Sequence, residues 1–196
     1  MIRHGETGWN NQRRIQGGST DIALSDQGKQ QIRRLALALQ NEEITAIYSS
    51  PLSRAVDTAK AIAEYHKLQI EVVPALRELE VGELEGVFVK DLGIDFSSYL
   101  LNWREGDGLK KLPGGESLAD LRARAWSFVE QVVSQHQGTV VMVSHYFVIL
   151  SIICAALGLP PSGIRRFRIG VSSTSILEFK DSLPCLNLLG DTCYLE

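Results

Sequence analysis

Short segments rich in β-branched residues alternate along this chain with longer segments whose apolar residues repeat at helical spacing. The strand-like segments are residues 46–48, 70–73, 139–143 and 175–179. The helical segments are residues 27–39, 53–65, 118–135 and 146–157. Ser25 and Ser117 are placed to begin two of these helices, and Gly158 with Pro160 ends the last one. The alternation predicts an α/β fold, a three-layer α/β/α sandwich in which helices cover both faces of a mainly parallel sheet.

The chain is long enough for one domain with a sizeable core, and its composition is that of a globular protein. Of its 196 residues, 44% are hydrophobic and 22% are charged. No repeat, low-complexity tract or linker divides residues 1–196, so a single domain is expected. Residues 86–115 lack strand periodicity and carry aromatic side chains among polar ones. We interpret them as a short cap over the carboxyl ends of the strands, the alternative being a surface excursion that packs onto the core.

Charge and cysteine content exclude several classes of protein. The net charge of −3 argues against nonspecific nucleic-acid binding, which needs a positive field. Three cysteines, Cys154, Cys185 and Cys193, are too few and too scattered for a disulfide scaffold, and no CxxC pair indicates zinc. No apolar run is long enough to span a bilayer, and no signal peptide is visible. We therefore expect a cytoplasmic protein with no membrane or nucleic-acid partner.

A histidine near the start of the chain lies among cationic and amide side chains. Residues 3–17 read RHGETGWNNQRRIQG, which places His4 next to Arg3 and shortly before Arg13 and Arg14. A histidine attacks phosphorus only when one ring nitrogen is neutral and aimed, and when nearby cations stabilise the charge on the phosphoryl oxygens. Arginine suits that task because its planar fork binds phosphate in bidentate fashion and stays charged. This segment therefore predicts a phosphate site.

Three candidate segments follow predicted strands. His4 follows a first strand expected at the very start of the chain, residues 49–54 follow the strand at 46–48, and His145 follows the strand at 139–143. The ligand crevice of a parallel α/β sheet lies beyond the carboxyl ends of its strands. We therefore expect the three segments to form one pocket.

Five motifs in this order resemble those of the histidine phosphatase superfamily, in the branch of the cofactor-dependent phosphoglycerate mutases and their small phosphatase relatives. The motifs are residues 3–17, 48–55 (YSSPLSRA), 76–86 (LRELEVGELEG), 113–117 (PGGES) and 143–145 (VSH). Together they run in the family's order over nearly the whole chain. The resemblance implies a phosphoglycerate mutase-like fold that uses no cofactor and no metal in the phosphatase reaction.

The resemblance also implies roles for individual residues. His4 would be the nucleophile that becomes a phosphohistidine, and Glu78 would be the general acid and then the general base. Arg3, Arg54 and His145 would hold the transferring phosphoryl group. Further phosphate contacts would come from Asn10, from Gln16 and from the backbone of Tyr146, which stands where many relatives have glycine.

For these residues, structural roles without a function in catalysis are the alternative interpretations. Arg54 could be a surface arginine, and His145 could be a core histidine at a strand end. Glu78 is one of five acids between residues 71 and 85, so the resemblance alone selects it. Before Arg3 stand only two residues, which span about 7 Å of strand. Either the first strand is unusually short, or the native gene encodes further apolar residues upstream.

We expect a metal-independent phosphomonoesterase acting on a small phosphorylated metabolite. The alternatives are a phosphoglycerate mutase and a non-catalytic relative that binds phosphorylated ligands. Mutases of this family carry a longer basic insertion, whereas the cap here has few cations: Lys90, Arg104, Lys110 and Lys111. The apolar tail at 185–189 could form an edge strand, so a monomer and a homodimer both stay open.

Overall fold

The computed structural model describes residues 1–92, 108–181 and 183–196. Its sheet has the strand order β3-β2-β4-β1-β5-β6. The strands are β1 (Ile2–Arg3), β2 (Ile44–Ser49), β3 (Ile70–Val72), β4 (Thr139–Ser144), β5 (Thr174–Lys180) and β6 (Leu183–Asp191). The first four strands of that order run parallel, whereas β5 is antiparallel to β1 and β6 is antiparallel to β5. The predicted α/β sandwich is confirmed, with an antiparallel hairpin at one edge of a mixed sheet.

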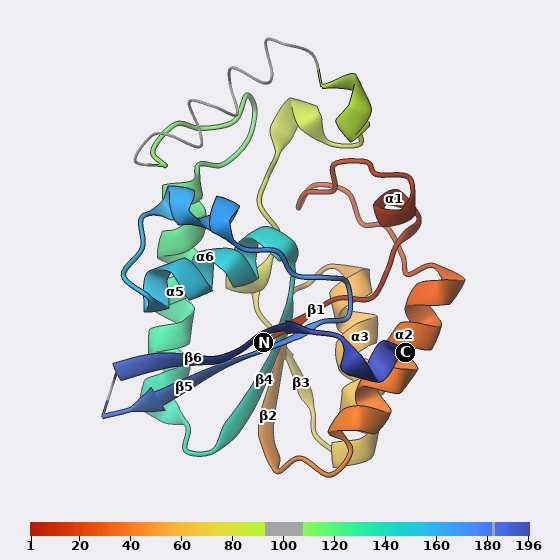
Figure 1. Ribbon diagram of the computed structural model, residues 1–196, viewed down its shortest axis with the longest axis vertical. Helices are drawn as coiled ribbons and strands as arrows, with labels where there is room; N and C mark the ends of the chain where they lie inside the picture. Colours follow the sequence, from red (N-terminus) through yellow and green to blue (C-terminus); the bar gives the residue numbers. More distant parts are fainter. Residues whose placement is uncertain (93–107, 182) are drawn as a thin grey trace.

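Helices cover both faces of this sheet (Figure 1). They are α2 (Asp26–Leu39), α3 (Ser53–His66), α5 (Leu118–Gln135) and α6 (Tyr146–Ala156), whereas the short α1 (Gly8–Asn11) lies among the loops beyond the strand ends. On one face α2 and α3 pack with Val141 and Val143 of β4, and on the other α5 and α6 pack with Met142. Successive strand side chains point to opposite faces, so β4 contributes to both cores. The helices α2, α3, α5 and α6 begin and end close to the predicted positions, whereas α1 was not predicted. No helix in the described ranges is both long and apolar enough to cross a membrane.

Side-chain caps fix the starts of two long helices. The Ser25 hydroxyl accepts a 3.0 Å hydrogen bond from the Gly28 N–H at the start of α2. At the start of α5 the Ser117 hydroxyl accepts from the Asp120 N–H at 3.0 Å, and the Asp120 carboxylate accepts from the Ser117 N–H at 3.3 Å. Such caps satisfy N–H groups that have no partner inside the helix, which explains why the sequence located these starts well.

The two-residue strand β1 lies in the middle of the sheet (Figure 1). Ile2 pairs with Val143 of β4 on one side and with Thr174 of β5 on the other. The N–H group of His4, the first residue after β1, donates to the Ser144 carbonyl at 3.1 Å. Because β1 ends here, the peptide that carries His4 leaves the sheet at its centre.

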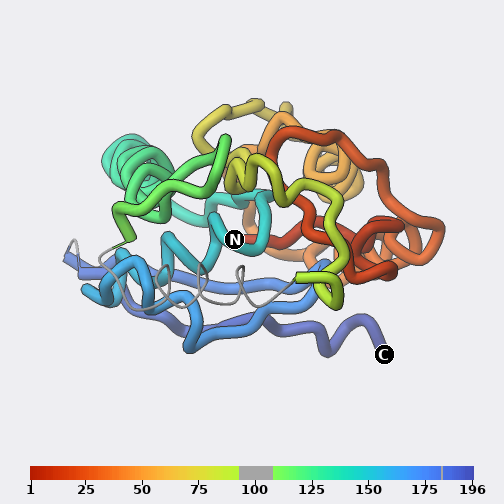
Figure 2. The backbone as a smooth tube through the Cα atoms, turned by 90° about the horizontal axis from the view of Figure 1, so that it is seen from above, coloured from red at the N-terminus to blue at the C-terminus, as the bar shows by residue number. Residues whose placement is uncertain are grey.

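Short 3-10 helices and loops gather at the carboxyl end of the parallel strands, seen from above in Figure 2. The 3-10 helices at this end are η1 (Pro74–Leu76), η2 (Gly82–Leu84), η3 (Val89–Asp91) and η4 (Pro161–Arg166). Another, η5 (Cys193–Leu195), lies near the C-terminus and packs with α2. Residues 86–89 pair with residues 13–15 through three backbone hydrogen bonds of 2.8 to 2.9 Å. Half of the predicted cap at residues 86–115, namely residues 93–107, lies outside the described residues.

Gly82 holds the segment after Glu78 against the loop at residues 113–115. Its φ is +57°, and a Cβ on it would meet the Pro113 carbonyl oxygen at 1.9 Å. Gly82→Ala is therefore expected to lower the free energy of unfolding by about 2 to 4 kcal/mol, the sum of left-handed strain and overpacking. Denaturant unfolding of the two proteins measures this difference.

Gly158→Ala is the matched control for that substitution. Gly158 also has a positive φ, +65°, but nothing lies within 4 Å of its added Cβ. Gly158→Ala should lower the free energy of unfolding by about 1 kcal/mol, from the left-handed strain alone. Equal losses for the two variants would show that the close packing at Gly82 contributes nothing.

Candidate active site

A pocket of about 410 Å³ opens where the parallel strands end. Among the described residues its lining includes Arg3, His4, Asn10, Gln16, Glu78 and Tyr146. His4 follows β1, Glu78 follows η1, and Tyr146 begins α6 after β4. Arg54, in the first turn of α3, and His145, just before α6, are fully buried beside this group and do not line the pocket. The three predicted segments thus meet at one end of the sheet.

The His4 ring is held in one orientation. It is 3% exposed, and its Nδ1 lies 2.7 Å from the Gly5 carbonyl oxygen. Since a carbonyl only accepts, this contact places the proton on Nδ1 and leaves the lone pair on Nε2. Burial, and then the charges of Arg54 and Arg3, hold the pKa of His4 well below its usual value. A neutral imidazole with a free Nε2 lone pair is the form that can act as a nucleophile.

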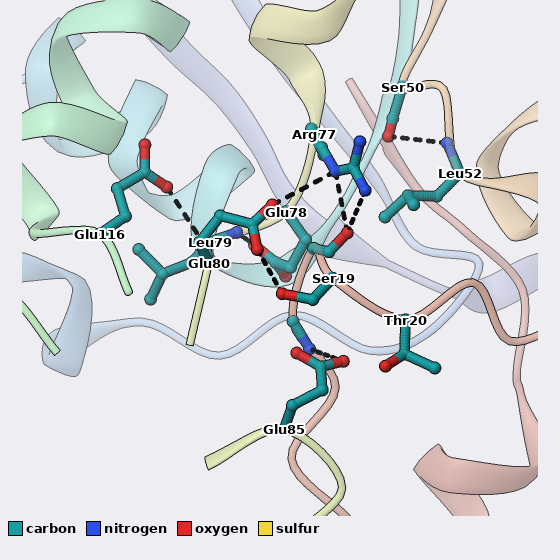
Figure 3. A network of polar contacts seen from close by, with 12 residues as sticks. Ser19, Thr20, Ser50, Leu52, Arg77, Glu78, Leu79, Glu80, Glu85 and Glu116 are labelled. Carbon is teal, nitrogen blue, oxygen red and sulfur yellow. Dashed lines mark hydrogen bonds and ion pairs between the residues drawn. The ribbon is translucent and has the colours of Figure 1, made fainter. Parts of the chain in front are cut away.

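His145 lies against His4 with 5.0 Å between the ring centroids. Its Nε2 is 2.7 Å from the Ser50 hydroxyl, whereas its buried Nδ1 has no hydrogen-bond partner. Ser50 Oγ also accepts a 3.4 Å contact from the Leu52 N–H, so its own proton is free for His145 (Figure 3). That pairing makes Nε2 the acceptor and Nδ1 an N–H donor. Burial, and then His4 and the arginines, lower the pKa of His145 well below its usual value.

Arg54, which is buried, and Arg3, which is half-buried, each keep one buried N–H group without a partner. Arg54 donates to the carbonyl oxygens of Gly17 at 2.9 Å and Thr20 at 3.3 Å, while its Nε has no acceptor. Arg3 donates to the Ile169 carbonyl at 2.9 Å, and its Nε is likewise unpaired. Burial lowers the pKa of Arg54 to about 10, so it stays charged at neutral pH. Buried cationic donors without acceptors are costly, and an anion would satisfy them.

Glu78 is a buried carboxyl group at the same pocket. It is 3% exposed, and its two oxygens accept from the N–H groups of Leu79 at 2.8 Å and Phe147 at 3.3 Å. Burial raises the pKa of Glu78, against the opposing effect of those bonds and of Arg54 and Arg3. Of the five acids between residues 71 and 85, Glu78 is the one that lines the pocket. Its place suits a group that donates a proton to a leaving oxygen.

The side chains of the three auxiliary candidates lie in different settings. The Asn10 Oδ1 accepts from the Thr7 N–H at 3.1 Å, which closes the capping box of α1. The Gln16 Oε1 accepts from the Thr7 hydroxyl at 2.9 Å, which leaves its buried Nε2 as a donor without a partner. The Tyr146 hydroxyl donates to the Phe167 carbonyl at 3.3 Å, and the Arg3 guanidinium lies 5.1 Å from its ring centroid. The Tyr146 ring is therefore held in place against the Arg3 guanidinium.

The segment that follows Leu76 also forms hydrogen bonds with the loop at residues 17–20, whose carbonyl oxygens accept hydrogen bonds from Arg54. Arg77 donates twice to the Gly18 carbonyl, at 2.8 and 2.6 Å, and Glu85 accepts from the Gly17 N–H at 3.1 Å (Figure 3). Ser19 donates to Glu80 at 2.5 Å. Thus the loop that contacts Arg54 is tied to the segment that carries Glu78. The sequence reasoning missed Ser50 and Glu85, although both lie inside motifs that it singled out.

Positive charge at this site comes from arginine. No group of three or more His, Cys, Asp or Glu side chains in the described parts of the chain could hold a metal ion. Arg3 and Arg54 both act electrostatically on His4 and on Glu78. The site thus combines two fixed cations, two neutral imidazoles and one carboxyl group.

Comparison with known proteins identifies the family of this chain. The sequence profile described as histidine phosphatase superfamily (branch 1) matches residues 1–192. Phosphoserine phosphatase 1 of Hydrogenobacter thermophilus is 34% identical over 196 residues, which is 100% of this chain and 92% of that protein. A probable phosphoglycerate mutase of Yersinia enterocolitica is 34% identical over 206 residues, covering 100% of this chain and 94% of the relative.

Solved structures show the same fold. A mutant phosphoserine phosphatase from Entamoeba histolytica in complex with phosphoserine superposes with a TM-score of 0.87 and 29% identity, over 100% of this chain and 97% of that one. A mycobacterial glucosyl-3-phosphoglycerate phosphatase superposes with a TM-score of 0.85 and 30% identity, over 97% and 96% of the two chains. From its motifs, its fold and these relatives, the chain belongs to the histidine phosphatase superfamily, branch 1.

Proposed function

We propose that this protein is a phosphomonoesterase that hydrolyses a small phosphorylated metabolite through a phosphohistidine on His4. The observation that carries the proposal is the neutral, oriented His4 ring beside buried arginine N–H groups that lack acceptors. Relatives named as phosphatases of phosphoserine and of glucosyl-3-phosphoglycerate support hydrolysis of small substrates. We also propose a cytoplasmic location, because the three cysteines are free thiols.

In the first step the Nε2 lone pair of His4 attacks phosphorus and the ester P–O bond breaks. Arg3, Arg54 and the Nδ1–H of His145 stabilise the charge on the equatorial oxygens. Asn10, Gln16 and the backbone N–H of Tyr146 add contacts to the same oxygens. Glu78 gives its proton to the leaving oxygen, which departs as an alcohol.

In the second step water attacks the phosphohistidine. The Glu78 carboxylate accepts a proton from that water while the P–N bond breaks, and inorganic phosphate leaves. The bond electrons return to Nε2 of His4. Glu78 is then protonated again and ready for the next substrate.

Phosphate release distinguishes this function from its alternatives. With a panel that includes phosphoserine and 3-phosphoglycerate, we expect stoichiometric inorganic phosphate and a phosphohistidine trapped by rapid quench. A mutase would interconvert 2- and 3-phosphoglycerate faster than it releases phosphate when a bisphosphoglycerate primer is added. A non-catalytic relative would bind these compounds and release nothing, and either result would overturn the proposal.

A further inference from the structure

Beyond the phosphoryl end, the pocket is lined mainly by aliphatic side chains. They come from separate segments of the described chain and include Ile15, Leu84, Val89, Leu92, Leu112 and Ile164. Phosphoserine and phosphoglycerate expose carboxylate, amino or hydroxyl groups directly beside the phosphate. An aliphatic wall offers such groups no hydrogen bonds, so they would lose water without compensation. The wall therefore favours a leaving group with a hydrocarbon body.

The pocket volume fits the same conclusion. At about 410 Å³ it falls in the range of about 300 to 1,000 Å³ typical of sites for drug-sized ligands. A leaving group of three carbons would fill only the part next to His4. The rest of the pocket needs a longer body to exclude water from its wall.

A second set of cations lines the pocket on the segment after α6. Arg165, on η4, and Arg168 are both exposed, and they line the pocket together with Ser162. The Arg168 side chain donates to the Arg165 carbonyl at 2.9 Å and to the Phe167 carbonyl at 2.7 Å, which fixes its place. Glu78 is the sole carboxylate in the described lining, and it belongs to the phosphoryl end. In a chain of net charge −3, this is a local positive site without a matching acid.

We propose that the preferred substrate is a phosphomonoester whose alcohol has an extended hydrocarbon body and a terminal anionic group. The phosphate binds at His4, the body contacts the aliphatic wall, and the terminal anion binds Arg165 and Arg168. This inference rests on the proposed phosphatase function and adds the substrate class.

The test uses two series of phosphomonoesters of increasing chain length, monoalkyl phosphates and their ω-carboxyalkyl counterparts, with phosphoserine as the small polar reference. In the unaltered protein kcat/KM should rise about fourfold for each methylene that is buried, until the pocket is full. At equal length the carboxylated ester should exceed the plain ester by about tenfold, as expected for a charge-assisted contact.

Variants separate the two parts of the site. In R165Q/R168Q the ratio of kcat/KM for carboxylated over plain esters should fall to about one. R166Q is the matched control, because Arg166 is an exposed neighbour on η4 that does not line the pocket, and it should keep the ratio. In Leu84→Ser the gain per methylene should shrink while the carboxylate ratio persists.

Two failures have different meanings. No phosphate release from any ester would overturn the proposed function itself. Release with kcat/KM independent of chain length, or with a carboxylate ratio unchanged in R165Q/R168Q, would overturn this inference and leave the phosphatase function intact.

Discussion

Replacement of His4 by alanine is expected to lower kcat for phosphate release by at least about 10⁴-fold, the order seen when a catalytic nucleophile is removed. The His4 ring carries a nucleophilic nitrogen lone pair on Nε2, and it is oriented by the 2.7 Å contact of its Nδ1 with the Gly5 carbonyl. His145 cannot replace it, because its Nε2 is paired with Ser50. The measurement is phosphate release under saturating substrate, with rapid quench to detect the phosphohistidine.

His66→Ala is the control for this variant. His66 is a half-buried residue at the end of α3 and does not line the pocket. Its loss should change kcat less than about twofold and stability by up to about 1 kcal/mol, the value of a histidine at a helix C-terminus. Retention of wild-type activity in His4→Ala, with the thermal transition preserved, would contradict nucleophilic catalysis by His4.

The helices were predictable because their signals are local. Apolar residues repeat at helical spacing in α2 and α5, and Ser25 and Ser117 cap them with side-chain hydrogen bonds. The direction of β5 was not predictable in this way. Strand period is the same in parallel and antiparallel pairs, so only the tertiary contact of β5 with Ile2 and with β6 decides it.

The contact of His4 with His145 followed from topology. Each histidine comes directly after the end of a strand, and the two strands, β1 and β4, are neighbours in the sheet. The choice of Glu78 did not follow from local pattern, since its four neighbouring acids have the same chemistry. What separates it is burial: Glu71 and Glu83 are exposed, and Glu80 and Glu85 hold the loop at residues 17–20. The contact of Ser50 with His145 spans 95 positions and depends on side-chain geometry that no local spacing encodes.

Glu78→Gln is expected to affect the two chemical steps differently. Loss of the general acid should lower kcat/KM for alkyl phosphates by about 10² to 10⁴-fold. An aryl phosphate with a good leaving group needs no proton, so its first step should be slowed much less. The second step loses its base for every substrate. With the aryl ester we therefore expect a burst of one phenol per site and accumulated phosphohistidine.

The pH dependence of kcat/KM tests the same assignment of Glu78 as the general acid. Burial raises the pKa of Glu78, so the protonated acid persists to higher pH than for an ordinary glutamate of pKa about 4.3. Its contribution to kcat/KM for alkyl esters is present below that raised pKa and is lost as the pH rises through it. The pKa of His4 is lowered, so the nucleophile stays neutral even when the pH is below about 6.5, the ordinary pKa of histidine.

The unaltered protein should therefore show an alkaline decline with alkyl esters that Glu78→Gln lacks. The exposed Glu83 supplies the control, since Glu83→Gln changes a charge in the same segment without touching the pocket and should keep the decline. A glutamine at position 78 must place its NH₂ against the N–H of Leu79 or Phe147, so a stability loss of about 1 to 3 kcal/mol is expected as well. That loss alone would lower the rates for alkyl and aryl esters equally, whereas removal of the acid slows them unequally. Equal slowing of both esters without a burst would assign Glu78 a structural role and leave the leaving oxygen to another donor.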